Sequence, residues 1–107
     1  MQVHSFLHSD TETYTHVLAD VQQQVCAIID PVLDFDAKSG RTDTASVDKV
    51  IAFVREQGWA LVYIIETHAH ADHISAAIHV KETLGGKLVI GQHINKKKKI
   101  FKQIFNF

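Results

Sequence analysis

Residues 60–73 read Ala-Leu-Val-Tyr-Ile-Ile-Glu-Thr-His-Ala-His-Ala-Asp-His, and this stretch decides how the chain is interpreted. Its first half, residues 60–65, is apolar and partly β-branched, which is typical of a buried strand. Its second half places three histidines and one aspartate within six residues. Imidazole nitrogens and carboxylate oxygens are ligands that zinc and iron prefer. We therefore predict that His68, His70, Asp72 and His73 form a metal-binding loop, with Asp72 also the candidate catalytic residue.

The spacing of these four residues predicts how they are presented. In extended chain, side chains alternate between two sides, so the first three can point together, whereas His73 joins them only if the chain turns. Apolar residues then recur at roughly helical spacing over residues 74–84, and Gly85-Gly86 ends that pattern. The motif is therefore expected at a strand-to-helix junction, which is where site-bearing loops commonly lie.

The rest of the chain predicts a mixed sheet covered by helices. Strands are expected at residues 3–7, 13–19, 25–29, 60–65 and 87–90, the first three as an antiparallel meander. The polar stretch 34–43 is expected to be a loop. Valine and isoleucine at positions 47, 50, 51 and 54 predict an amphipathic helix, capped by Asp43 or Thr44 and ended by Gly58. The expected fold class is α/β (α+β), with two helices laid over one sheet.

Composition divides the chain into two unequal parts. At 107 residues, with 46% hydrophobic and 21% charged side chains, the chain has the size and balance of one small globular domain. Residues 1–95 hold all 12 acidic groups, whereas residues 96–107 hold five lysines and no acid. We predict a folded part over 1–95 and a basic, amphipathic tail over 96–107. The tail is interpreted as a solvated helix face, because no nucleic-acid-binding module surrounds it.

Several classes of protein are not indicated. No apolar run is long enough to span a membrane, and the N-terminus lacks the pattern of a secretory signal. The single cysteine, Cys26, lies in an apolar run and is expected to be a buried, unreactive thiol. We therefore expect a cytoplasmic protein with neither nucleic acid nor membrane as a partner.

The motif His-x-His-x-Asp-His after a buried strand resembles the metal signature of the metallo-β-lactamase fold superfamily. The run Glu66 to Ala77, with the runs Ile29 to Asp34 and Arg41 to Ser46, is most similar to its persulfide (sulfur) dioxygenase-like branch. Glyoxalase II-type members commonly have a further histidine between the first two and a larger residue before the aspartate. The resemblance covers roughly residues 3–95. It implies the first half of an αββα sandwich of two related halves.

The resemblance implies two possible metal arrangements, and the motif leaves both open. In dinuclear members, His68 and His70 would hold one metal while Asp72 and His73 hold the second, and a water of lowered pKa attacks a carbonyl or phosphoryl centre. In the persulfide dioxygenase branch, one Fe(2+) is held by two histidines and one aspartate, of which only His68 would come from this motif. The expected cofactor is thus Fe(2+) or Zn(2+).

The resemblance also implies that further ligands come from the second half of the family's fold. No Gly-His-Thr-like loop follows residue 95, so we expect a truncated persulfide dioxygenase-like protein that is inactive by itself. The substrate would be glutathione persulfide, or a thioester if the chain is a zinc-dependent glyoxalase II-like fragment. A non-catalytic metal-binding or assembly module is the third possibility. Self-association or a complementing second half is expected.

Three further expectations concern single residues. Asp30 ends a strand and is expected either under the metal loop, orienting a histidine, or as a simple turn residue. His4, His8 and His16 are expected at surface strand positions, and His79 on an exposed helix face. The inner sheet face, which the second half would cover, is expected to consist of Val25, Ile28, Leu61, Ile64 and Val89.

Overall fold

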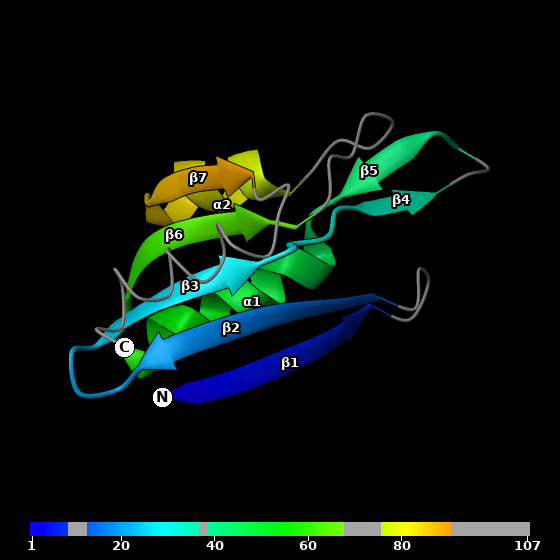
Figure 1. The fold of residues 1–107 in the computed structure, drawn as a ribbon. Coiled ribbons are helices and arrows are strands. Elements are labelled where there is room, and N and C mark those ends of the chain that lie inside the picture. Colours follow the sequence, from blue (N-terminus) through cyan, green and yellow to red (C-terminus); the bar gives the residue numbers. More distant parts are fainter. Residues whose placement is uncertain (9–12, 37–38, 68–75, 91–107) are drawn as a thin grey trace.

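The computed structural model describes residues 1–8, 13–36, 39–67 and 76–90, and it contains a five-stranded sheet with two helices. The strand order is β1-β2-β3-β6-β7 (Figure 1). The first three strands, β1 (Gln2–His8), β2 (Thr13–Asp20) and β3 (Val25–Ile29), form the expected antiparallel meander. The strands β6 (Ala60–Glu66) and β7 (Lys87–Ile90) add in parallel to β3. The predicted α/β class with a mixed sheet is confirmed.

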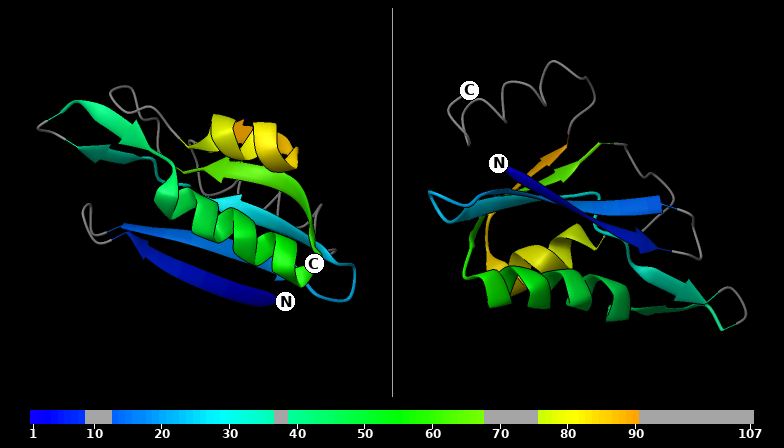
Figure 2. Two further views of the ribbon diagram at one scale, coloured as in Figure 1. Left: turned by 180° about the vertical axis from the view of Figure 1, so that it is seen from behind. Right: turned by 90° about the horizontal axis from the view of Figure 1, so that it is seen from below.

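Both helices cover the same face of this sheet (Figure 2). The helix α1 (Ala45–Gln57) connects β3 to β6, and α2 (Ala77–Leu84) connects β6 to β7. The helix α1 ends where expected, because Gly58 adopts a left-handed conformation at φ 73° and its N–H bonds to carbonyls of the last turn. That conformation costs glycine little and other residues more.

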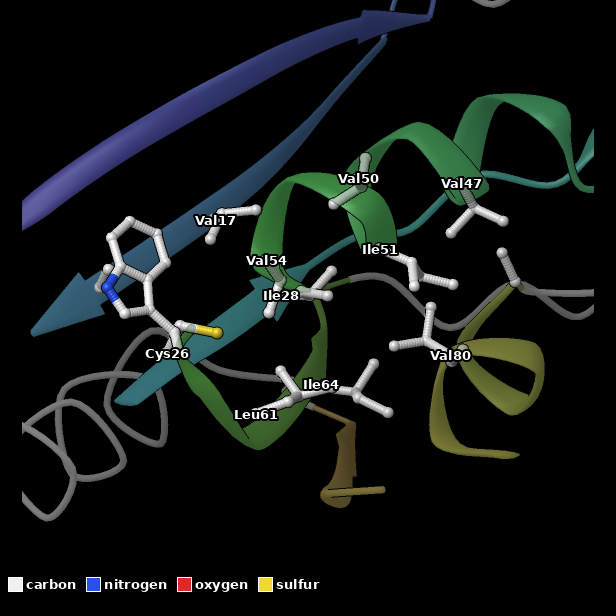
Figure 3. Close-up of a cluster of buried hydrophobic side chains, with 14 residues drawn as sticks. Val17, Cys26, Ile28, Val47, Val50, Ile51, Val54, Leu61, Ile64 and Val80 are labelled. Atoms are coloured by element: carbon white, nitrogen blue, oxygen red, sulfur yellow. The ribbon is translucent and has the colours of Figure 1, made fainter. Parts of the chain in front are cut away.

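The main core lies between the helices and the sheet (Figure 3). Val17, Ile28, Val54, Ile64 and Val80 are essentially inaccessible to solvent there. The strands β2 and β3 contribute alternate residues to this face, and α1 contributes the stripe predicted from its spacing.

The predicted membership of the inner sheet face is wrong for three of its five residues. Ile28, Leu61 and Ile64 pack on the helix side, in the main core. Val25 packs on the opposite face in a second cluster, and Val89 is paired with Ile65 of that cluster. Two features explain the difference. Strict alternation separates Val25 from Ile28, and a register shift beside Cys26 and Ala27 brings Leu61 and Ile64 to one side.

The stretch expected to be a loop contains two short strands instead. The strands β4 (Asp34–Asp36) and β5 (Arg41–Asp43) pair antiparallel and form a separate two-stranded sheet. Gly40 supplies a positive φ of 69° at the turn between them. Aspartates have low strand propensity, so the sequence gives little sign of this pairing.

None of the described helices is both long and apolar enough to cross a bilayer. The predicted division into residues 1–95 and a tail over 96–107 stays a prediction, because residues 91–107 lie outside the described part.

Truncation of a core side chain should cost far more than the same change at the surface. We expect Ile64→Ala to lower the free energy of unfolding by about 2–5 kcal/mol, because Ile64 is 0% exposed and its loss leaves a cavity. Ile78→Ala in α2 is the matched control, since Ile78 is 61% exposed and should cost under about 0.5 kcal/mol. Urea denaturation of both variants checks this, and equal losses would contradict the assigned core.

Candidate functional site

Four of the five strands end at the same edge of the sheet, and the predicted metal-binding residues follow one of these strand ends in the sequence. The strands β1, β3, β6 and β7 all run in one direction, as their arrowheads in Figure 1 show. Their carboxyl ends therefore lie at the same edge, which is where ligands commonly bind in open α/β sheets. The predicted ligands His68, His70, Asp72 and His73 come directly after β6 and Thr67. They lie outside the described residues, so their assignment stays a prediction.

Asp30 fixes the point at which that loop begins. Its Oδ1 accepts a hydrogen bond of 2.8 Å from the backbone N–H of Thr67, and its Oδ2 accepts one of 2.6 Å from the Thr67 hydroxyl. A carboxylate that accepts two bonds in this way holds both the backbone and the side chain of its partner. Thr67 is the residue immediately before His68, so the last described residue ahead of the predicted ligands is held through both its backbone and its side chain.

Asp30 is itself held by its backbone. Its N–H donates to the Ile65 carbonyl at 2.8 Å, and its carbonyl accepts from the Thr15 hydroxyl at 2.8 Å. Its φ of 54° lies in the left-handed region, which aspartate tolerates better than most residues. Asp30 thus contacts the residue that precedes the predicted loop, and its position under that loop stays a prediction. Whether it also orients a histidine stays a prediction.

A second polar cluster lies at the same end of the sheet, on the helix side. Asp34 accepts from His8 Nε2 at 2.7 Å, from the Ser46 hydroxyl at 2.6 Å and from the Ser46 N–H at 2.8 Å. His8 is only 7% exposed, so the expectation that it lies on the surface is wrong. Its partner is 26 residues away in the sequence, and no local pattern could have indicated it.

This cluster caps α1 from outside the helix. The side chain of Thr44, at the N-cap position, makes no cap hydrogen bond, and Asp34 instead accepts the N–H of Ser46 in the first turn. Partial burial opposes ionisation of Asp34, but the hydrogen bonds from Ser46 and His8 together lower the pKa of its carboxyl below the usual value. The ionised carboxylate also suits the positive end of the helix dipole.

A third contact ties α2 to α1. His79 Nε2 lies 2.8 Å from Asp48 Oδ1, and Asp48 Oδ2 accepts from the Thr44 hydroxyl at 2.8 Å. The hydrogen bonds from His79 and Thr44 lower the pKa of Asp48. His79 is 34% exposed, so it is at the helix surface as expected but has a partner there. Because α2 follows the predicted metal loop, this contact fixes the helix onto which the loop leads.

Among residues 1–8, 13–36, 39–67 and 76–90, no three His, Cys, Asp or Glu side chains lie close enough together to hold a metal. The metal-binding assignment of positions 68, 70, 72 and 73, whose residue types suit a metal, concerns residues outside this part of the chain and stays a prediction. Cys26 offers no alternative as a ligand or nucleophile. It is buried in the main core, and burial raises the pKa of its thiol to about 12.

Comparison with known proteins points to one superfamily. Residues 13–101 match the family described as the metallo-beta-lactamase superfamily. A probable metallo-hydrolase of Burkholderia pseudomallei is 44% identical over 99% of this chain and 36% of its own length. Glyoxylase B2 of Dictyostelium discoideum is 36% identical over 98% of this chain and 36% of its own length.

Persulfide dioxygenases match a shorter region. The mitochondrial persulfide dioxygenase ETHE1 of Bos taurus is 36% identical over 69% of this chain and 25% of its own length. The crystal structure of ETHE1 from Myxococcus xanthus superposes with a TM-score of 0.65 at 28% identity, over 82% of this chain and 34% of that one. The chain thus spans about a third or less of the length of these relatives.

The Asp30–Thr67 contact generates the first prediction about the site. In Asp30→Asn an amide N–H₂ must replace one of the two accepting oxygens, so one Thr67 donor loses its acceptor. We expect a loss of about 1–3 kcal/mol in the free energy of unfolding, together with weaker metal binding.

Asp43→Asn is the matched control, because Asp43 also accepts a backbone N–H, from Ala45, but at the exposed surface. Asparagine serves equally well at such helix starts. Urea denaturation and elemental analysis of both variants check the prediction, and similar results for the two would contradict it.

The lowered pKa of Asp34 generates a pH prediction. A carboxyl with a lower pKa in the folded state stabilises the fold above its unfolded pKa of about 3.9. That contribution is lost as the pH falls through the folded value. We expect Asp34→Asn to be less stable than the natural protein at pH 7 by about 1–2 kcal/mol, with the gap closing below about pH 4. Denaturation at pH 7, 5 and 3 measures this, and a gap independent of pH would contradict it.

Proposed function

The chain belongs to the metallo-β-lactamase superfamily, and on that basis we propose that it is the N-terminal part of a metal-dependent enzyme that oxidises glutathione persulfide. The observation that carries the proposal is the motif His-x-His-x-Asp-His, placed directly after a strand end that Asp30 holds through Thr67. The likeness to ETHE1 in sequence and in fold supports the persulfide branch.

In this proposal the motif residues divide the work between binding and catalysis. His68 would bind the iron, and His70, Asp72 and His73 would lie around it and hold substrate-side water. Iron, when bound, would supply oxygen activation. Asp72 is the proposed catalytic residue, because a carboxylate beside the metal can accept a proton or orient a water. Asp30 would act through Thr67 by keeping His68 in position.

A zinc-dependent thioester hydrolase is the second candidate. The metallo-hydrolase and Glyoxylase B2 match nearly the whole chain, whereas the persulfide dioxygenase matches 69% of it. In this case His68 and His70 would hold one zinc and Asp72 and His73 the other. Zinc, when bound, would supply an activated water for attack on the thioester carbonyl.

Turnover is proposed to need the rest of the fold as well. The chain spans 36% of the metallo-hydrolase it matches, and one short loop does not surround a metal from all sides. A complementing second half would supply the remaining ligands and the substrate contacts. An isolated chain that binds metal tightly yet turns over neither substrate would be consistent with this arrangement, and also with the non-catalytic module.

The metal assignment can be tested on the chain itself. We expect His68→Ala/His70→Ala to reduce the iron or zinc content of the purified protein at least tenfold, because two of the proposed ligands are removed. His4→Ala/His16→Ala is the matched control, since it removes two histidines from β1 and β2. Elemental analysis with a thermal unfolding curve for each variant checks that the fold persists. Equal metal content in the two variants would contradict the assignment.

The choice between the two activities requires a protein that carries this segment together with the remaining part of the fold. Loaded with iron, it should consume oxygen in the presence of glutathione persulfide, and His68→Ala should abolish that uptake. Hydrolysis of S-lactoylglutathione by the zinc form, with no oxygen uptake by the iron form, would overturn the first candidate in favour of the second.

A further inference from the structure

The edge strand β1 lacks the charges, prolines and bulges that commonly prevent edge strands from pairing with another chain. It lies at the outside of the five-stranded sheet, with β2 on one side and no described residue paired to the other (Figure 1). Its seven residues, Gln-Val-His-Ser-Phe-Leu-His, include no Asp, Glu, Lys, Arg or Pro. Charges, prolines and bulges are the common means by which proteins block such edges.

The strand is also held in place and apolar on its exposed side. Val3 and Leu7 are 61% and 59% exposed, and both lie on the face away from the helices. On the helix side, the ring of Phe6 packs 5.4 Å from that of Phe53, and the ring of His4 packs 4.8 Å from it. These contacts hold β1 to α1. The strand is therefore already ordered, and pairing at its outer edge would carry little further cost in conformational entropy.

We propose that β1 pairs antiparallel with β1 of a second copy of this chain, about a twofold axis at Ser5. Residues that face each other in a continuous sheet must point to the same side, so only registers centred on a residue are allowed. Centring on Ser5 overlaps all seven residues. It sets Val3 opposite Leu7 of the second copy and Leu7 opposite Val3, which gives two apolar cross-strand pairs.

The same register leaves no like charges opposed. His8 lies opposite Gln2 of the second copy, and His4 lies opposite Phe6. Centring on Phe6 instead would set His4 opposite His8, and centring on His4 would set Val3 opposite Ser5. The pairing joins two sheets of five strands by their edges and does not cover the face of either sheet that lies away from the helices. Because the contact is small, we expect a dissociation constant of roughly micromolar order.

Disulfide mapping tests the register directly. Facing residues in antiparallel strands have Cα atoms about 4.5–5.5 Å apart, which suits a disulfide. Ser5→Cys should therefore give a cross-linked dimer on mild oxidation. Val3→Cys alone and Leu7→Cys alone should not, whereas a mixture of these two should cross-link. The natural Cys26 does not interfere, because it is fully buried.

Glu82→Cys, at an exposed position of α2, is the control for random collisions. Cross-linking of Ser5→Cys and of the Val3→Cys and Leu7→Cys mixture, each at least tenfold faster than the control, supports the proposal. Equal rates for all variants, or no cross-linking of Ser5→Cys, would overturn it.

A charge-swap experiment separates this pairing from other apolar association. Val3→Lys/Leu7→Lys places lysines opposite each other across the axis, so the dimer should be lost in sedimentation velocity. Val3→Lys/Leu7→Glu places opposite charges across the axis, so the dimer should be recovered. Both positions are exposed, and the fold should tolerate the changes. Equal loss in both variants would overturn the proposal in favour of another partner for this face, and retention in both would overturn it as well.

Discussion

The two hydrogen bonds that Thr67 donates to the Asp30 carboxylate are the interaction on which the arrangement of the proposed site depends. The Asp30 side chain binds the backbone and hydroxyl of Thr67, and its own backbone is bound to Ile65 and Thr15. Three strands, β2, β3 and β6, are joined through this one residue at the edge where the predicted metal loop begins. Asp30 makes these contacts from a left-handed backbone conformation with a φ of 54°.

The first turn of α1 has a similar role on the helix side. Asp34 binds Ser46 and connects the turn to His8, and Asp48 binds His79 and connects it to α2. Both contacts use carboxylates whose pKa is lowered by hydrogen bonding. The exposed pair between Asp48 and His79 contributes little free energy, whereas the less accessible Asp34 group satisfies several donors at once. The main effect of the Asp34 hydrogen bonds is therefore to fix where α1 begins.

These contacts involve the residue before and the helix after the predicted metal-binding segment. The entry to the loop is held by Asp30, and the helix that follows it is held against α1 by His79. Metal sites require ligands whose orientation is set by surrounding hydrogen bonds. The described residues on either side of positions 68–75, Thr67 and the helix α2, are thus each held by hydrogen bonds.

The sequence by itself determined the local elements and the family. The valine and isoleucine stripe of α1, the apolar run of β6 and the dense histidine motif are signals carried by neighbouring residues, so they can be read directly. Tertiary structure decided the pairing of β4 with β5, the burial of His8 against Asp34 and the face on which Ile28 and Ile64 pack. Asp30 and Thr67 are 37 residues apart, and only the parallel pairing of β3 with β6 brings them together. Such contacts depend on register and strand order, which short-range patterns do not encode.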